Sequence, residues 1–410
     1  MPRARDRARD RAPGAPRARA RDRRRDAAGD RAVSAAPSVR ATRWVIAGGG
    51  TGGHVTPALA LGQAARAAGE PCLFVGARRG LETRLVPEAG FELVALDARP
   101  LVGRSPRERA AALAALAAST LAAARALRAF RADFVISVGG YAAAPAALAA
   151  LLLRRPYAVL EANARPGAAN RLVARRARRI FVEFEAAGRA LTGRAADPRV
   201  VATGLPLRRE LLAAFAGGTP ARSPAPPFRL FVCGGSQGAK QVNDALLAVL
   251  PRLDPARFEV VHQTGESDRE RVAAAYAAAG VRATVVAFER DMASRYRAAD
   301  LVISRAGAMT LAELALAGRP ALLVPLTHTG GGEQLENARE RERAGAALVL
   351  DPARDAGEAL FEALEKLLAD PARLAAMAAA AARLARPDAA ERILAACRAL
   401  LGPDGAEARA

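Results

Sequence analysis

The chain is poor in cysteine, histidine and aromatic residues. Of its 410 residues, 3 are cysteines and 3 are histidines, and aromatic residues make up 4%. The cysteines, at positions 72, 233 and 397, have no paired spacing, which argues against a disulfide framework or a zinc site and favours a reducing compartment. No Asp-x-Asp pair occurs and the histidines are far apart, so we predict no metal site.

Long apolar runs are also missing. One uncharged run, residues 110–124, is mostly alanine and falls short of the ~20 residues that a membrane-spanning helix needs. We therefore expect no segment that spans a bilayer. The N-terminus lacks the apolar stretch of a secretory signal.

Acidic residues are outnumbered, with 41 Asp and Glu against 62 Lys and Arg. Residues 1–43 alone hold 14 arginines and 5 aspartates and few apolar residues, which predicts a disordered basic tail over residues 1–42. Such a tail could bind nucleic acid or an anionic membrane. We prefer a dispensable extension or an over-called start, because low-complexity composition alone is weak support for binding.

The rest of the chain repeats one plan twice. Short apolar runs alternate with helical patterns from Trp44 onward, and the plan restarts at Phe228 after a stretch rich in Pro, Gly and Ser. We predict an α/β fold with two Rossmann-like doubly wound domains, 43–207 and 228–385, which face a cleft. A linker, 208–227, joins them. A C-terminal helix over 386–402 follows. One option is that this helix packs back against the first domain.

Each half opens with a glycine turn between a strand and a helix, "GGGTGGH" at 48–54 and "GGSQGA" from 234. Backbone N–H groups at such a helix start suit phosphates, but no G-K-[ST] follows, so neither turn is a P-loop. A nicotinamide site needs an acidic residue about 20 positions on, where this chain has Arg78 and Arg79. NADP binding therefore stays a weak option, as does a purely structural turn.

Further strings complete a pattern that is similar to one family. They are "SVGGYAAAP", "EANARPGAANR", "HQTG", "FERDM", "SRAGAMTLAEL" and "EQLENA". In this order and spacing, from about 45 to 401, the chain resembles the MurG family of bacterial N-acetylglucosaminyltransferases. Departures from the family pattern are Leu160, Ala162, Leu205 and Glu333, and they bear on substrate contacts.

The resemblance implies a GT-B fold and an inverting reaction that needs no metal and no cofactor. N-acetylglucosamine would pass from UDP-N-acetylglucosamine to the 4-hydroxyl of undecaprenyl-diphosphoryl-N-acetylmuramyl-pentapeptide in peptidoglycan synthesis. The expected location is the cytoplasmic face of the cell membrane, as a peripheral protein on anionic lipid. Basic and apolar side chains near 106–130 and 171–180 suit such docking, and ordinary helix packing explains them equally well.

His54 is the expected general base or its orienting partner, because a helix N-terminus disfavours the charged imidazolium. Glu161 is the rival catalytic residue, and Asn163 is a further rival for this role or for acceptor binding. The expected acceptor-binding residues are Gly50, His54, Tyr141 and Asn170. The first glycine turn is thus interpreted as a cradle for the acceptor diphosphate.

The resemblance also assigns residues to the UDP-sugar. They are Thr51, Gly52, Gly53, Asn163, Arg208, Ser236, Gln237, Gly238, His262, Phe288, Met309, Thr310, Glu313, Gln334 and Asn337, with Gln263 and Arg305 beside the nucleotide. Glu313 would hold the ribose hydroxyls, although Thr310 and Glu313 also have capping-box spacing. Gln334 and Asn337 would face the sugar from one side of a helix.

Three other classes of protein remain open. One is a different GT-B enzyme, such as a diacylglycerol glycosyltransferase or a UDP-N-acetylglucosamine 2-epimerase. A second is an NADP oxidoreductase. The third is a nucleic-acid-binding protein that uses the basic tail, although we expect no nucleic-acid partner. The oligomeric state cannot be inferred from the sequence.

Overall fold

The computed structural model describes residues 40–98, 106–219, 224–235, 238–326, 332–351 and 353–402, without the side chains of 106–109. The expected disordered tail lies outside the described residues up to position 39. Ser236 and Gln237 of the second glycine turn lie outside them as well.

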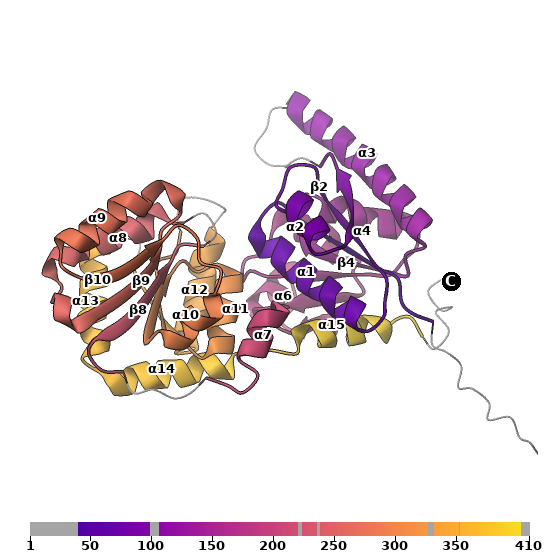
Figure 1. Cartoon of the computed structure of the whole chain (residues 1–410). Helices are drawn as coiled ribbons and strands as arrows, with labels where there is room; N and C mark the ends of the chain where they lie inside the picture. Colours follow the sequence, from indigo (N-terminus) through magenta and orange to yellow (C-terminus); the bar gives the residue numbers. More distant parts are fainter. Residues whose placement is uncertain are drawn as a thin grey trace, which may run out of the picture. The chain divides into compact units, whose positions relative to one another are not determined.

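Seven parallel strands form the sheet of the N-terminal half, in the order β3-β2-β1-β4-β5-β6-β7 (Figure 1). The order reverses between β1 and β4, which is where a doubly wound sheet opens a crevice at the carboxyl ends of its strands. The strands are β1 (Trp44–Gly48), β2 (Cys72–Ala77), β3 (Glu92–Leu96), β4 (Phe134–Gly139), β5 (Tyr157–Glu161), β6 (Arg179–Val182) and β7 (Val200–Ala202).

Helices cover both faces of this sheet, because alternate residues of a strand point to opposite faces. Trp44 and Ile46 pack in one core with α1 and α15, whereas Val45 and Ala47 pack in another with α3 and α4. The helices of this half are α1 (Gly52–Ala67), α2 (Glu82–Glu88), α3 (Pro106–Phe130), α4 (Ala143–Leu152), α5 (Ala168–Ala174), α6 (Glu185–Thr192) and α7 (Arg209–Ala214).

The C-terminal half repeats the plan with six parallel strands, in the order β10-β9-β8-β11-β12-β13. Its strands are β8 (Phe228–Cys233), β9 (Phe258–Gln263), β10 (Arg282–Val286), β11 (Leu301–Ser304), β12 (Ala321–Leu323) and β13 (Ala347–Val349). Its helices are α8 (Lys240–Val249), α9 (Arg269–Ala278), α10 (Met292–Ala298), α11 (Ala308–Ala317), α12 (Glu333–Arg343), α13 (Ala356–Leu368) and α14 (Pro371–Arg383), with short 3-10 turns at Leu250–Arg252, Pro255–Arg257 and Glu266–Asp268. The prediction of two doubly wound α/β sheets is confirmed.

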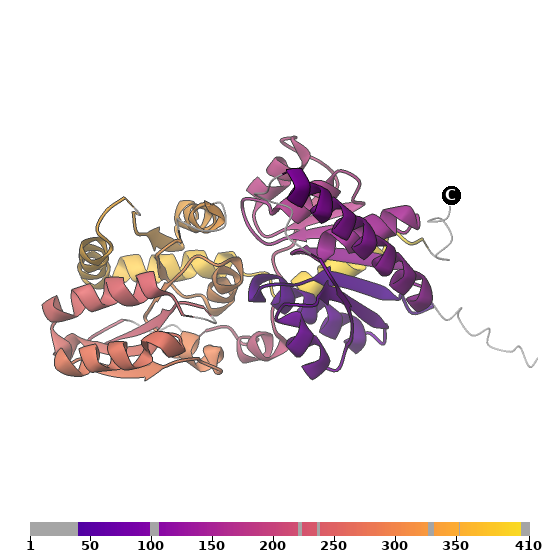
Figure 2. The same cartoon turned by 90° about the horizontal axis from the view of Figure 1, so that it is seen from above.

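The last helix, α15 (Ala389–Arg398), packs against α1 of the N-terminal half (Figures 1 and 2). Arg398 donates two hydrogen bonds of 2.8 Å to the buried carboxylate of Glu70, which also accepts one of 2.7 Å from the Trp44 indole. These contacts fix the end of the chain to the first sheet. The domain limits 43–207 and 228–385 stay predictions.

Helix α3 differs from the expectation for apolar segments. Its part Ala110–Phe130 is, among the described residues, the one helix long and apolar enough to cross a membrane by length and composition. The helix is longer than the uncharged run because it continues through Arg125 and Arg128, and the expectation that no segment spans a bilayer stays a prediction. Since Ala123 and Leu127 pack in the core beside α4, we interpret α3 as a surface helix of the N-terminal half.

Candidate active site

The first glycine turn follows β1 and leads directly into α1. This helix begins at Gly52 with Thr51 as its N-cap, so His54 lies in the first turn. Thr56 and Pro57 are residue types that suit the N-cap and first turn of a helix, and in the sequence they predict an N-cap at Thr56, but both lie inside α1. The N–H groups of His54 and Val55 both bond to the Thr51 carbonyl, 3.1 Å away, and the N-cap thus lies five residues before Thr56.

A buried carboxylate that the sequence analysis missed lies beneath this turn. Glu82 is 1% exposed and accepts hydrogen bonds of 2.8 Å from the backbone N–H groups of Gly50 and Ala77. A Cβ at Gly49 would lie 2.0 Å from Glu82 Oε1, and one at Gly80 would lie 2.1 Å from Oε2. The glycines therefore make room for Glu82, and the N–H of Gly50 is already used.

His54 is half-buried at the rim of the turn. Burial lowers the pKa of His54 below its ordinary value, while the Gly49 backbone and the negative charge of Glu82 oppose that shift. The ring Nδ1 lies 3.3 Å from Thr51 Oγ1. The imidazole is thus neutral at pH 7, as a proton acceptor must be, with burial as the main cause.

Glu161 ends β5 and is 2% exposed. Its oxygens accept from the N–H groups of Asn163 and Gly167, both at 3.0 Å, and from Asn170 Nδ2 at 2.9 Å. Burial raises the pKa of Glu161, and these hydrogen bonds partly oppose the rise. Asn170 is also buried and donates to the Leu160 carbonyl. Both side chains hold the loop after β5.

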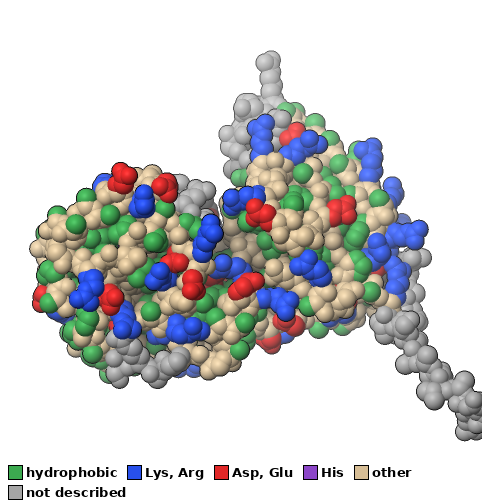
Figure 3. Space-filling view, viewed as in Figure 1, with side chains coloured by type: hydrophobic (Ala, Val, Ile, Leu, Met, Phe, Trp, Pro, Cys, Tyr) green, Lys and Arg blue, Asp and Glu red, His purple; other side chains and the backbone are tan. Residues whose placement is uncertain are grey.

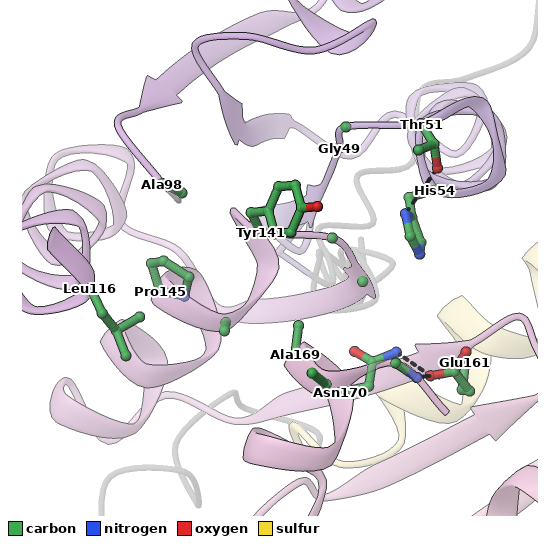
Figure 4. Close-up of a pocket in the computed structure, with 16 residues that line it drawn as sticks. Gly49, Thr51, His54, Ala98, Leu116, Tyr141, Pro145, Glu161, Ala169 and Asn170 are labelled. Atoms are coloured by element: carbon green, nitrogen blue, oxygen red, sulfur yellow. Dashed lines mark hydrogen bonds between the residues drawn. The ribbon is translucent and has the colours of Figure 1, made fainter. Parts of the chain in front are cut away.

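These elements line one pocket of about 230 Å³ at the switch point of the first sheet (Figure 4). The turn after β1, the glycines after β4 and the loop after β5 all contribute to it, as the topology requires. Tyr141, expected in the acceptor site, is 51% exposed and lies on the wall. Of the catalytic and acceptor residues, the pocket brings together Gly50, His54, Tyr141, Glu161 and Asn170, along with Thr51.

The second glycine turn follows β8. Gly238 has φ +75°, and a Cβ there would lie 2.0 Å from the Thr264 carbonyl oxygen, so this position requires glycine. Gln263 Nε2 donates to the Gly235 carbonyl at 2.9 Å and braces the turn. The diphosphate roles expected of Ser236 and Gln237 fall outside the described residues.

His262, which we expect to line the nucleotide cleft, has its side chain in the core of the C-terminal half. The ring is fully buried, with Nδ1 3.1 Å from the Tyr276 hydroxyl and Nε2 3.1 Å from Asn243 Oδ1. Burial lowers the pKa of His262 to about 4. A neutral ring with both nitrogens engaged is a core histidine that joins β9 to α8 and α9.

Glu313 lies in α11 and is 7% exposed. It accepts a hydrogen bond of 3.2 Å from Arg208 and one of 2.9 Å from the Tyr296 hydroxyl. The capping-box alternative was wrong, because α11 begins at Ala308 with Gly307 as N-cap and Thr310 lies inside the helix. Each carboxylate oxygen keeps a second lone pair for another donor.

The two amides of α12 do not share one environment. Gln334 is half-buried, and its Oε1 lies 3.4 Å from Arg305 Nε. Asn337 is fully buried, accepts from Ala164 N–H at 2.8 Å and donates to Asn163 Oδ1 at 3.0 Å. Asn337 therefore contacts the loop after β5, and its expected contact with the sugar stays a prediction. Phe288 is 56% exposed and Met309 is half-buried.

Known proteins share this architecture. The descriptions "Glycosyltransferase family 28 N-terminal domain" and "Glycosyltransferase family 28 C-terminal domain" match residues 44–182 and 229–393. A relative from Geobacter metallireducens is 40% identical over 356 residues, which are 86% of this chain and 97% of the relative. One from Syntrophotalea carbinolica is 42% identical over 365 residues, which are 88% of this chain and 99% of the relative. Both are named UDP-N-acetylglucosamine–N-acetylmuramyl-(pentapeptide) pyrophosphoryl-undecaprenol N-acetylglucosamine transferase.

Solved structures agree. Acinetobacter baumannii MurG matches with a TM-score of 0.72 and 28% identity, over 87% of this chain and 99% of that one. A Staphylococcus aureus MnaA–UDP structure matches with a TM-score of 0.62 and 15% identity, over 88% and 97%, and shares the fold.

Two doubly wound domains, each with a glycine turn at its switch point, together with these matches define a glycosyltransferase of the GT-B class. The chain belongs to the MurG family of N-acetylglucosaminyltransferases. For residues 44–182 and 229–393, this membership replaces the hypothesis of an NADP oxidoreductase. The hypothesis of nucleic-acid binding concerned the basic tail, which lies outside the described residues, and stays a prediction.

Proposed function

We propose that the chain transfers N-acetylglucosamine from UDP-N-acetylglucosamine to the 4-hydroxyl of undecaprenyl-diphosphoryl-N-acetylmuramyl-pentapeptide, with inversion and without a metal. The observation that carries this proposal is the pocket at the β1/β4 switch point, in a chain about 40% identical to transferases of that name. The first glycine turn then faces the acceptor, and the C-terminal half binds the donor.

His54 is the general base in this proposal. The acceptor oxygen attacks C1 of the sugar, the bond from C1 to the β-phosphate oxygen breaks, and UDP leaves with the bonding electrons. The hydroxyl proton moves to the imidazole, whose lowered pKa keeps it unprotonated at pH 7. Thr51 Oγ1, close to Nδ1, orients the ring.

Glu161 serves as a positioning residue rather than as the base. Three N–H donors already engage its two oxygens, and they come from the loop that forms the pocket floor. A carboxylate held in this way has less capacity to accept the hydroxyl proton. Its negative charge and hydrogen bonds instead keep Asn170 and Gly167 at the pocket wall.

Donor binding is assigned to the carboxyl ends of the second sheet. The N-terminus of α11 and the glycine turn after β8 present positive backbone dipoles to the departing diphosphate. Glu313 accepts ribose hydroxyls, and Arg208 beside it neutralises charge. Gln334 contacts the sugar, whereas Asn337 holds Asn163 and Ala164 in place.

Peripheral membrane docking is assigned to α3 and places the enzyme on the cytoplasmic face. Its outward side from Ala110 to Leu121 carries no charge, and Leu113 and Leu121 are 62% and 51% exposed. Arg125 and Arg128 follow in the same helix and are exposed. Basic side chains gather at the edge of the N-terminal half (Figure 3). Apolar surface beside basic charge suits anionic lipid.

The docking proposal is tested by sedimentation with phosphatidylglycerol vesicles, with phosphatidylcholine vesicles as the control. Leu113→Asp with Leu121→Asp is expected to lower the partition coefficient at least about tenfold, because two apolar side chains no longer insert. Transfer to a soluble short-chain acceptor stays unchanged. Undiminished vesicle binding would assign docking to another surface.

The base is tested by single-turnover transfer in the presence of EDTA. We expect His54→Ala to lower the rate about 100-fold or more, and Glu161→Gln to act mainly through stability and acceptor KM. If His54→Ala retains the wild-type rate and Glu161→Gln does not, the two roles are exchanged.

A further inference from the structure

The pocket at the switch point has two chemically different ends (Figure 4). His54, Thr51, Glu161 and Asn170 lie at one end with the first glycine turn. The side chains at the other end are apolar: they are Ala98, Leu116 and Pro145. The ring of Tyr141 stands between the two groups. A ligand that fills the pocket must therefore be polar at one end and apolar at the other.

We infer that the apolar end is a binding subsite for the first isoprene units of the acceptor's prenyl chain, next to the diphosphate. The inference rests on the proposed function, because it takes the glycine turn as the diphosphate site. A prenyl diphosphate changes from charged to hydrocarbon across one bond. The pocket wall changes in the same way, from the turn past Tyr141 to Leu116 and Pro145.

The position of Leu116 connects this subsite to the membrane. Leu116 comes from α3 and is half-buried against the pocket, whereas Leu113 and Leu121 of the same helix are exposed. One side of α3 thus lines the pocket and another carries the proposed docking surface. A prenyl chain that leaves the pocket past Leu116 would therefore leave it at the helix that carries the proposed docking surface.

Leu116 and Leu113 provide a matched pair of variants. Both are leucines of one helix, three residues apart, and glutamine suits a helix at either site. Leu116→Gln places an amide in the subsite, whereas Leu113→Gln changes only the outer surface. Burial of the first isoprene units against apolar side chains is worth about 10- to 100-fold in affinity.

The experiment compares two soluble acceptors without membrane or detergent. Both are diphosphoryl-N-acetylmuramyl-pentapeptides: one carries a two-isoprene chain and the other a methyl ester. The wild type is expected to prefer the prenyl acceptor in kcat/KM by about 10- to 100-fold. Leu116→Gln should reduce this preference to below about threefold, through KM for the prenyl acceptor, and Leu113→Gln should keep it.

The methyl acceptor separates the possible failures. Unchanged kcat/KM on it, and unchanged KM for the donor, show that Leu116→Gln folds and reacts normally. A wild type that uses both acceptors equally overturns the subsite while the proposed function stands. If Leu116→Gln lowers kcat/KM equally on both acceptors, the apolar end binds the muramyl-peptide instead. That result also overturns the prenyl subsite. No transfer to either acceptor by folded wild type refutes the proposed function itself.

Discussion

The substitution Glu82→Gln tests how the first glycine turn is held. The carboxylate is buried and accepts two backbone N–H groups, from Gly50 and Ala77, at 2.8 Å each. Glutamine has only one accepting oxygen, so its NH₂ group faces the second backbone N–H and cannot accept from it. That buried N–H is left without an acceptor, which lowers the free energy of unfolding by about 1–3 kcal/mol. The remaining bond also loses its charge assistance, which adds about 1 kcal/mol.

We therefore expect a loss of about 2–4 kcal/mol, which lowers Tm by about 4–16 °C for a domain of this size. The assay is thermal unfolding followed by steady-state kinetics below the transition. The variant should raise KM for the acceptor and leave KM for the donor unchanged, because Glu82 fixes the turn of the N-terminal half alone.

Glu70→Gln is the matched control, since Glu70 is a second buried carboxylate of the same half that bonds to Trp44 and Arg398 away from the pocket. It should lower Tm without changing acceptor KM. A Glu82→Gln protein with wild-type Tm and acceptor KM would refute the account of the turn, and an equal acceptor effect in both variants would show a general loss of structure.

Two further predictions concern the turn and the second sheet. Gly49→Ala should lower Tm by several degrees, because the new Cβ would lie 2.0 Å from Glu82 Oε1. Gly52→Ala is the control and should melt like the wild type, because a Cβ at Gly52 has no atom within 4 Å. Equal Tm values for the two variants would contradict this prediction. For His262, whose pKa is lowered to about 4, the unfolded chain binds a proton that the folded chain does not between pH 6.5 and 4. Stability should therefore fall by about 3 kcal/mol as pH drops through that window, as measured by urea unfolding. A His262→Gln protein with the same pH slope would show that other groups cause it.

The sequence predicts the sheets well because apolar periodicity and glycine turns are local signals. The strands and their parallel order follow from the alternation of short apolar runs and helical patterns. The pocket residues His54, Glu161 and Asn170 come from three segments, and the resemblance brought them together before the structure did. The start of a helix is harder to predict. Thr56 is a residue type that suits an N-cap, but α1 already begins at Gly52 in the glycine turn.

Other features depend on tertiary packing, which one sequence does not reveal. Glu82 looks like a surface residue of "GLETRL", and its burial follows from glycines at three separate positions. The nearby glycines were the available signal, since they leave room for a side chain. His262 and Asn337 belong to motifs of the family, yet their rings and amides point into protein. Membership of a family motif therefore does not tell whether a side chain contacts the ligand or holds neighbouring residues in place.

The most direct test of the account is an acceptor panel with the wild-type protein. Labelled UDP-N-acetylglucosamine and EDTA are incubated with the prenyl-diphosphoryl-N-acetylmuramyl-pentapeptide, with diacylglycerol, or with no acceptor. We predict label in the muramyl lipid alone, with UDP released in equal amount. Label in diacylglycerol, or an epimerised donor without acceptor, would contradict the proposed function.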